Sequence, residues 1–110
     1  WIERRIFPGA QPPSLGEMMQ IFEAQEFSVL DVENLRLHYA RTLLDWKALY
    51  DASEARVRDM FDERFVRSWR LYLAGSIAGF TTGSLQLFQV VFAPRHNNDL
   101  PQTRARLYAR

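Results

Sequence analysis

The chain has no cysteine and only two histidines, His38 and His96, among its 110 residues. Without cysteine it can form no disulfide bond, carry no thiolate nucleophile and hold no cysteine-ligated zinc. Two histidines so far apart in the sequence also lack the spacing of a metal site, so we expect no metal ligand. His38 has no evident orienting carboxylate, which argues against a catalytic triad.

Glycine is also scarce, and the loops that depend on it are missing. The five glycines never approach the G-x-G-x-x-G spacing of a nucleotide-binding loop, and no G-x-S-x-G nucleophile elbow occurs. The adjacent carboxylates Asp62 and Glu63 stand where a helix is expected to begin, a place that favours acidic residues for structural reasons. Taken alone, the chain does not have the residues of a complete enzyme.

Charge of one sign and long apolar runs are both lacking. Lys and Arg number 14 against 13 Asp and Glu, so the net charge of +1 gives no positive field for binding nucleic acid. The longest apolar stretch, residues 71–80, is about half of the ~20 residues that a membrane-spanning helix needs. No signal peptide opens the chain, so we expect a cytoplasmic protein. Because the first residue is Trp1 rather than methionine, we expect a fragment.

Apolar and aromatic residues are plentiful, at 47% and 14%, which indicates one folded domain or a part of one. After a proline- and glycine-rich break at residues 8–16, Ser14 and Glu17 have the spacing of a capping box. This spacing predicts a short helix over residues 14–25. Residues 27–37 begin with apolar residues on both faces, which predicts a mostly buried strand.

The second half of that strand is polar, with Asp31, Glu33 and Asn34. These side chains either face a ligand at the end of the strand or mark where the strand emerges into solvent, and the second interpretation is favoured.

Two long helices are expected next, because the apolar pattern takes a helical period. The stripe of the first consists of Tyr39, Leu43, Trp46, Tyr50, Ser53, Val57 and Met60. Glu54 and Arg58 add an i, i+4 pair on its solvent side. The second helix should run from its N-cap Asp62 to Gly83. Its main stripe consists of Phe65, Trp69, Tyr72, Leu73, Ser76 and Phe80.

One flank of the second helix is nearly bare, so that another backbone could approach it, and one edge is basic. The small residues are Ala74, Gly75, Ala78 and Gly79, and the basic residues are Arg64, Arg67 and Arg70. The arginines either contact anionic lipid headgroups or form an ordinary solvated face, and the solvated face is favoured.

Residues 85–92 predict a last strand that is covered on both faces, in which Gln86 and Gln89 must find hydrogen-bond partners. Residues 93–110 predict a loose or docked tail. If the two long helices pack as a pair, their stripes either form a closed core or line an apolar cleft. The pattern alone favours the core.

Four segments of the chain, in order, carry a family resemblance. They are WIERRIFPGAQPPS at 1–14, HYARTLLDW at 38–46, DERFVRSWRLYLAGSIAGFTTGSLQLFQVVF at 62–92 and LPQTRARLY at 100–108. Together they resemble the C-terminal portion of cyclopropane-fatty-acyl-phospholipid synthases and of the related mycolic acid cyclopropane synthases. Ala10 departs from the F-P-G-G tetrapeptide of that family.

The resemblance implies an α/β fold, the C-terminal part of a class I, Rossmann-like methyltransferase. Residues 1–110 would supply one segment of that domain, without its cofactor-binding half and with residues 93–110 as a tail. The segment would be mainly helical, with two long helices and two strands, residues 27–36 and 85–92, paired as antiparallel neighbours.

The resemblance also implies an activity. In the family, a methyl group passes from S-adenosylmethionine to the cis double bond of an unsaturated acyl chain, and a bound bicarbonate accepts a proton. The tyrosine that binds bicarbonate falls on Tyr39, and the candidate walls of the acyl site are Leu43, Tyr72, Ser76 and Phe80. Several relatives carry cysteine where Ser76 stands. The cofactor loop has no counterpart here, so no residue is expected to bind S-adenosylmethionine and the isolated chain is expected to be inactive.

Two alternatives stay open: a small-molecule N-methyltransferase of the same superfamily, and a non-catalytic helical dimerisation or binding module. The apolar stripes favour a lipid, so the expected partners are unsaturated phospholipid acyl chains at the inner face of the membrane, with no nucleic acid. Because half of a covered sheet leaves apolar faces and strand edges exposed, we expect the chain to self-associate.

Overall fold

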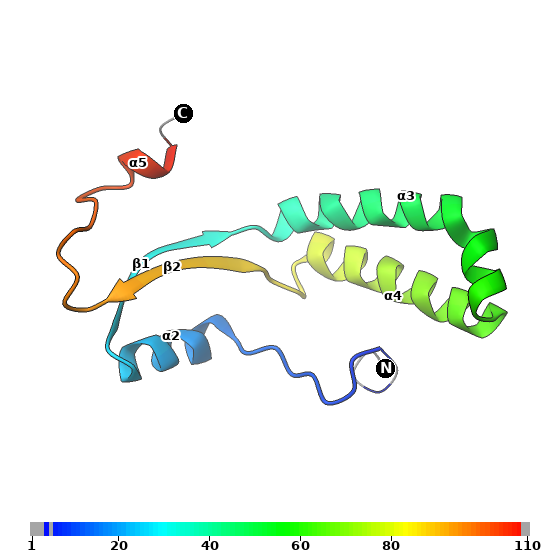
Figure 1. Ribbon diagram of the computed structural model, residues 1–110, viewed down its shortest axis with the longest axis horizontal. Coiled ribbons are helices and arrows are strands. Elements are labelled where there is room, and N and C mark those ends of the chain that lie inside the picture. The colour runs from blue at the N-terminus through cyan, green and yellow to red at the C-terminus, as the bar shows by residue number, and fades with distance from the viewer. Residues whose placement is uncertain (1–3, 5, 109–110) are drawn as a thin grey trace. The chain divides into compact units, whose positions relative to one another are not determined.

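The computed structural model describes residue 4 and residues 6–108 (Figure 1). Its elements are α2 (Leu15–Ala24), β1 (Phe27–Asn34), α3 (Arg36–Met60), α4 (Glu63–Thr82), β2 (Phe88–Pro94) and α5 (Ala105–Tyr108). The chain forms two compact units, one made of Trp1–Pro13 with Glu33–Gln89 and the other of Ser14–Val32 with Val90–Arg110. The predicted combination of long helices with two antiparallel strands is confirmed.

The first unit is dominated by a helical hairpin, in which α3 and α4 lie side by side (Figure 1). α3 begins at Arg36, so the prediction of a strand up to residue 37 and of a helix from Tyr39 was wrong by about one turn. The backbone N–H of Arg36 donates to Asn34 Oδ1 (2.9 Å), and the N–H of Tyr39 donates to the carbonyl of Leu35 (2.9 Å). These two bonds close the first helical turn earlier than the apolar pattern indicates.

The core of the hairpin is narrower than the predicted stripes. Leu43, Val66 and Leu73 are 1%, 0% and 2% exposed, and Val66 lies outside the predicted stripe. Trp46 and Met60, which belong to the stripe, are exposed. The difference is physical: two helices alone bury only the rows where they touch, so the rest of each apolar face stays open.

α4 begins and ends where the sequence predicts. Asp62 is its N-cap and accepts a hydrogen bond from the N–H of Phe65 (2.7 Å), while Gly83 ends it in the left-handed conformation (φ 89°). The flank of small residues on α4 is contacted by the side chain of Leu85. A Cβ on Gly79 would lie 2.7 Å from Leu85 Cδ1, whereas one on Gly75 would meet nothing within 4 Å.

β1 and β2 pair as neighbours, as predicted. A hydrogen bond from Leu35 N to Leu87 O (2.9 Å) closes one end of the ladder, and one from Arg95 N to Glu26 O (3.1 Å) closes the other. β2 begins at Phe88 rather than at residue 85. The cause is the exit from α4, where the N–H of Leu85 donates back to Gly79 O (3.0 Å) instead of joining the ladder.

In the second unit, α2 covers part of the strand pair. Ser14 and Glu17 form the predicted capping box, since each side chain accepts from the other residue's backbone N–H. The rings of Phe22 and Phe92 lie 4.5 Å apart and those of Phe27 and Phe92 lie 5.2 Å apart. Phe92 still remains 46% exposed, so the prediction of a strand covered on both faces does not hold for this chain by itself.

The tail after β2 is docked through charges. Arg104 forms an ion pair with Asp31, and Arg95 forms one with Glu26 (2.6 Å). Asp31 is only 9% exposed, so it does not emerge into solvent as the favoured interpretation had it. Its ion pair with Arg104 offsets part of the cost of burying a carboxylate, although Asp31 Oδ2 has no hydrogen-bond partner among the described residues.

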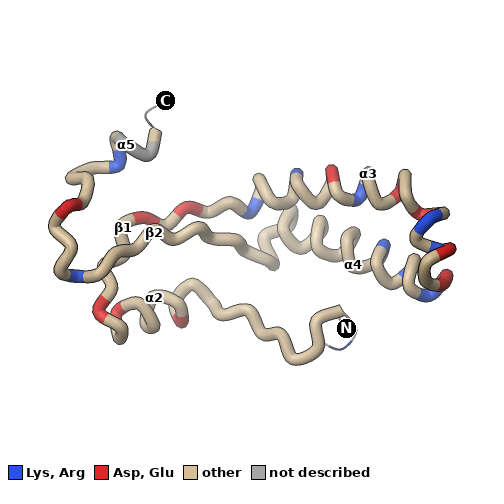
Figure 2. The backbone as a smooth tube through the Cα atoms, viewed as in Figure 1, with Lys and Arg blue, Asp and Glu red and all other residues tan. Residues whose placement is uncertain are grey.

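Charges of both signs alternate around the turn between α3 and α4 (Figure 2). The predicted pair of Glu54 and Arg58 forms (2.7 Å), and Arg58 also contacts Glu63 (2.6 Å). Arg70 forms an ion pair with Glu54, so one of the three predicted basic residues is occupied within the hairpin. No helix in the described part of the chain is long and apolar enough to cross a membrane.

Candidate functional site

Tyr39 lies in the first turn of α3, at the end of the hairpin next to the strands. Its half-buried ring packs edge-to-face on Phe80 of α4, with centroids 5.0 Å apart and an interplanar angle of 82°. The ring of Trp46, two turns further along α3, lies 6.1 Å from that of Tyr39, also edge-to-face. Among the described residues the hydroxyl of Tyr39 has no hydrogen-bond partner. A phenol in aromatic surroundings therefore keeps its donor available for a ligand.

The other predicted site residues do not line a single opening. Leu43 and Ser76 are buried in the hairpin, with exposed fractions of 1% and 5%. Tyr72 is turned toward a second aromatic group, where its ring lies 5.1 Å from that of Trp69 and 5.8 Å from that of Phe7. Of the predicted residues, the structure brings only Tyr39 and Phe80 into direct ring contact.

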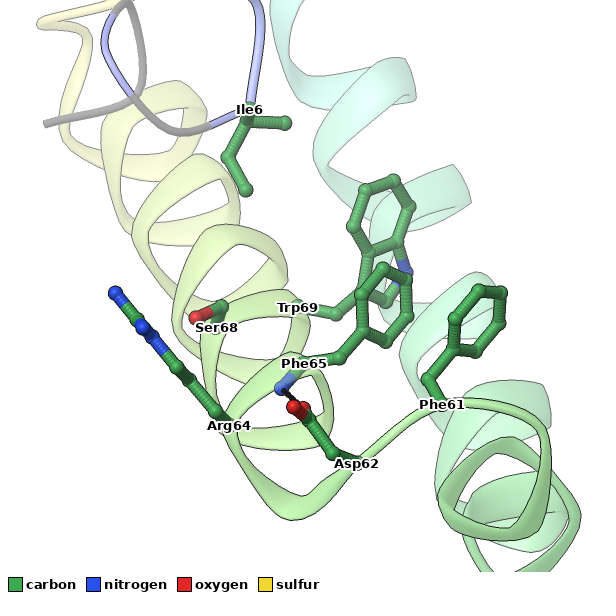
Figure 3. A pocket seen from close by; sticks show the side chains of 7 residues that line it. All are labelled: Ile6, Phe61, Asp62, Arg64, Phe65, Ser68 and Trp69. Carbon is green, nitrogen blue, oxygen red and sulfur yellow. Dashed lines mark hydrogen bonds between the residues drawn. The ribbon is translucent and has the colours of Figure 1, made fainter.

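A cavity of about 710 Å³ lies at the opposite end of the hairpin, beside the turn between α3 and α4 (Figure 3). It is lined by Ile6, Phe61, Asp62, Arg64, Phe65, Ser68 and Trp69. The rings of Phe61, Phe65 and Trp69 stack in a row along one side. By helical rise, Phe65 and Phe80 are about 22 Å apart along α4, so this cavity does not serve the Tyr39 end.

Between these two ends, a third tyrosine has a purely internal bond. Tyr50 Oη donates to the carbonyl of Val66 (3.2 Å) and so joins the two helices. Desolvation raises the pKa of Tyr50 above its usual value, while the positive charges of Arg70 and Arg58 oppose the shift. Tyr50 therefore stays a neutral hydrogen-bond donor at ordinary pH.

A group of polar residues at the Tyr39 end of the hairpin, which we name the base clasp, was missed by sequence reasoning. It consists of Asn34, Arg36, Gly83 and Gln86. Arg36 Nη1 donates to the carbonyls of Phe80 (2.7 Å) and Thr81 (2.9 Å) at the end of α4. Sequence reasoning singled out Asn34, Gly83 and Gln86 separately, Gln86 as needing a hydrogen-bond partner, but it did not single out Arg36.

Gln86 has two hydrogen-bond partners. It accepts from Asn34 Nδ2 (2.9 Å) and donates from Nε2 to Gly83 O (2.9 Å). Gln89, the second interrupting glutamine, is exposed. The base clasp thus joins the start of α3 to the end of α4 by side-chain bonds.

The chain resembles known proteins over most of its length. Residues 1–90 match the family model described as mycolic acid cyclopropane synthetase. The chain is 36% identical to the probable fatty acid methyltransferase of Pseudomonas putida, over 98% of this chain and 28% of that protein. It is 33% identical to the cyclopropane-fatty-acyl-phospholipid synthase of Escherichia coli (strain K12), over 94% of this chain and 27% of that protein.

The fold agrees with a solved structure. The crystal structure of mycolic acid cyclopropane synthase CmaA1, complexed with SAH and CTAB, superimposes with a TM-score of 0.80 and 30% sequence identity. The match covers 83% of this chain and 32% of that one. This chain therefore spans less than a third of the length of these relatives.

Proposed function

Because the chain belongs to the mycolic acid cyclopropane synthetase family of S-adenosylmethionine-dependent methyltransferases, we propose that it forms part of a lipid-modifying enzyme. The enzyme adds one carbon to the cis double bond of an unsaturated acyl chain of a phospholipid. The observation that carries this proposal is the similarity, along 94% of the chain, to a synthase whose name specifies that substrate. The chain by itself is inactive.

The proposed chemistry asks for a dry, aromatic environment. A methyl group added to one carbon of the double bond leaves a positive charge on the other carbon. Loss of a proton from the added methyl then closes a three-membered ring. Aromatic faces attract such a cation, and exclusion of water prevents its capture. The rings of Tyr39, Phe80 and Trp46 supply aromatic faces of this kind, although Trp46 is exposed in this chain.

Tyr39 fits a role in holding the base that takes the proton. Its hydroxyl has no partner among the described residues, so it can donate to a bound bicarbonate and orient it. Bicarbonate, when bound, supplies the proton acceptor. Phe80 and Tyr72 are the acyl-side candidates with half-exposed rings, and Leu43 and Ser76 act from the packed layer behind them.

The described residues do not fit S-adenosylmethionine. The glycines stand singly, and a Cβ on Gly79 would meet Leu85 while one on Gly83 would lie beside Arg36 and Gln86. The part of the chain that the structure describes therefore contains no glycine-rich backbone loop that could cradle the cofactor. We therefore assign no step through the methyl donor to this chain. No cluster of metal-ligating side chains occurs among the residues that the structure describes.

The proposed contact with the membrane surface is made by α4. Arg64 and Arg67 are exposed and have no ion pair among the described residues, so they can meet anionic headgroups of the lipid surface that holds the substrate. The protein acts peripherally at that surface.

The test uses the full-length protein that contains this chain, incubated with vesicles of unsaturated phospholipid and S-adenosylmethionine. Mass spectrometry should show acyl chains heavier by one methylene group. Tyr39→Phe should lower turnover on the order of 10²-fold, because the base would lose the hydrogen bond that orients it. Tyr50→Phe is the matched control and should keep full turnover, since its hydroxyl bonds only Val66 O.

Methylation of small amines with unmodified lipid would contradict the proposal and point to an N-methyltransferase. No transfer to either substrate class would point to a non-catalytic helical module. Fragmentation of the product chain separates a cyclopropane ring from a methyl branch.

A further inference from the structure

We infer that Arg36 is a positioning residue of this enzyme, because its guanidinium fixes Phe80 against the ring of Tyr39. The inference rests on the proposed function, in which Tyr39 orients the base. Arg36 touches neither substrate nor base itself and acts through the end of α4.

The contacts of Arg36 are those of a helix cap supplied from another helix. The last carbonyls of any α-helix lack intrahelical donors, and they carry the negative end of its dipole. Arg36 Nη1 donates to two of them, Phe80 O (2.7 Å) and Thr81 O (2.9 Å). Bonds from a charged donor are shorter and about twice as strong as neutral ones.

The same two turns carry the aromatic pair. Arg36 stands three residues before Tyr39, on the same face of the first turn of α3. Phe80 supplies one of the bonded carbonyls and also the ring that packs on Tyr39 at 5.0 Å. The cap therefore sets the distance between the two backbones from which these rings project.

The rest of the base clasp holds the backbone of Arg36 and the residues beside its guanidinium. Asn34 Oδ1 accepts the backbone N–H of Arg36, and Asn34 Nδ2 donates to Gln86, which in turn donates to Gly83 O. A Cβ on Gly83 would lie 3.6 Å from Arg36 Nη1, so the guanidinium already occupies the space beside this residue. The backbone of Arg36 is thus held by Asn34, and its guanidinium lies beside Gly83.

This arrangement matters for turnover more than for lipid binding. The Tyr39 hydroxyl must aim at a base while a proton is removed, and a displacement of about 1 Å at such a group can cost on the order of 10²-fold in rate. Both bonds come from Nη1, so lysine should replace Arg36 in part; its ammonium is a point charge on a flexible stem and is less firmly placed at that position.

The kinetic test compares Arg36→Met, Arg36→Lys and the control Arg41→Met in the full-length protein. Arg41 lies on the same helix with a side chain that is 79% exposed, and among the described residues it pairs only with Asp45 (3.6 Å). We expect Arg36→Met to lower kcat about tenfold while KM for the lipid changes less than about twofold. Arg36→Lys should recover part of the loss, and the control should match the parent. A rise in KM with unchanged kcat would overturn the inference.

A double substitution separates positioning from general weakening of the fold. If Arg36 acts through Tyr39, Arg36→Met should reduce kcat little further once Tyr39→Phe is present. Losses that multiply would show that Arg36 acts independently of Tyr39 and would overturn the inference.

Amide hydrogen exchange gives a readout without activity. Peptides covering residues 76–84 should exchange about tenfold faster in Arg36→Met than in Arg41→Met, as loss of a charged hydrogen bond implies. Unchanged exchange would overturn the inference. If the unsubstituted protein modifies no lipid, the proposed function fails, and the exchange result then decides alone whether Arg36 holds the end of α4.

Discussion

At the scale of single residues, the hairpin buries one leucine of α3 and exposes the leucine next to it. Leu43 is 1% exposed and Leu44 is 50% exposed. Leu43→Ala should lower the free energy of unfolding by about 2–5 kcal/mol, because it leaves a cavity that the helices cannot refill. Leu44→Ala should cost no more than about 1 kcal/mol. Urea unfolding of the 110-residue chain, followed by circular dichroism, measures both. Equal losses would contradict the observed packing.

Because of Tyr50, the stability of the hairpin should decrease with pH in the alkaline range. Desolvation raises the pKa of Tyr50 above 10.0, so the folded chain keeps this proton while the unfolded chain releases it. The stabilising contribution is complete below pH 10.0 and is lost as the pH rises through the higher folded-state pKa. The stability difference between the parent and Tyr50→Phe should therefore be constant up to about pH 10 and shrink above it. A difference that stays flat at higher pH would speak against this origin.

At the scale of elements, two glycines of α4 provide a matched pair. Gly75→Ala meets open space and should stabilise the chain by roughly 0.5–1 kcal/mol, since alanine is the better helix former. Gly79→Ala should lose that gain, because its Cβ would lie 2.7 Å from Leu85 Cδ1. Adding Leu85→Ala should restore the gain of the Gly79 substitution. Thermal unfolding compares the four chains, and equal effects at the two glycines would refute the contact.

The capping box at the N-terminus of α2 predicts how the stability of the chain changes at low pH. Glu17 accepts the backbone N–H of Ser14 (2.6 Å) and is also bonded through the Ser14 hydroxyl, and these bonds lower the pKa of Glu17 below 4.5. Its contribution is present above pH 4.5 and is lost as the pH falls through the lower folded-state pKa. Glu17→Ala should therefore destabilise the chain more at neutral pH than at low pH, whereas Ser14→Ala keeps the backbone N–H and should cost about 1 kcal/mol at both, because the Glu17 N–H bond to its hydroxyl does not titrate. A pH-independent cost of Glu17→Ala, measured by thermal unfolding, would rule out this coupling.

The elements that the sequence predicts well are those with local causes. The Ser14–Glu17 box, the Asp62 cap and the Gly83 stop each depend on residues within one turn, so a single chain segment reveals them. The start of α3 and the delayed start of β2 depend on bonds that no periodic pattern encodes.

The candidate site is only half predictable for the same reason. Tyr39 and Phe80 follow from resemblance and periodicity, and the structure pairs them. Arg36 lies 44 residues from its partner Phe80 and has no motif, so its role emerges only from the coordinates. The burial of Leu43 and Ser76 also depends on which face of each helix the other covers.

At the scale of the whole molecule, much apolar surface remains open. The exposed large apolar residues include Leu37, Leu49, Leu71, Phe61 and Phe92. Large exposed apolar patches mark sites of association. We predict that the 110-residue chain self-associates at micromolar concentration, with a mass by light scattering that falls on dilution. A monomer that persists across the concentration range would contradict this prediction.

The hairpin is fastened at both ends, by Arg36 at one and by the contact of Arg58 with Glu63 at the other. A residue deleted from the middle of α3 would turn everything beyond it by about 100°, and the bonds to α4 would lose their partners together. Natural length variation in this protein should therefore gather in the stretch between β2 and α5. A related sequence with a longer or shorter hairpin would have to gain or lose whole helical turns in α3 and α4 together.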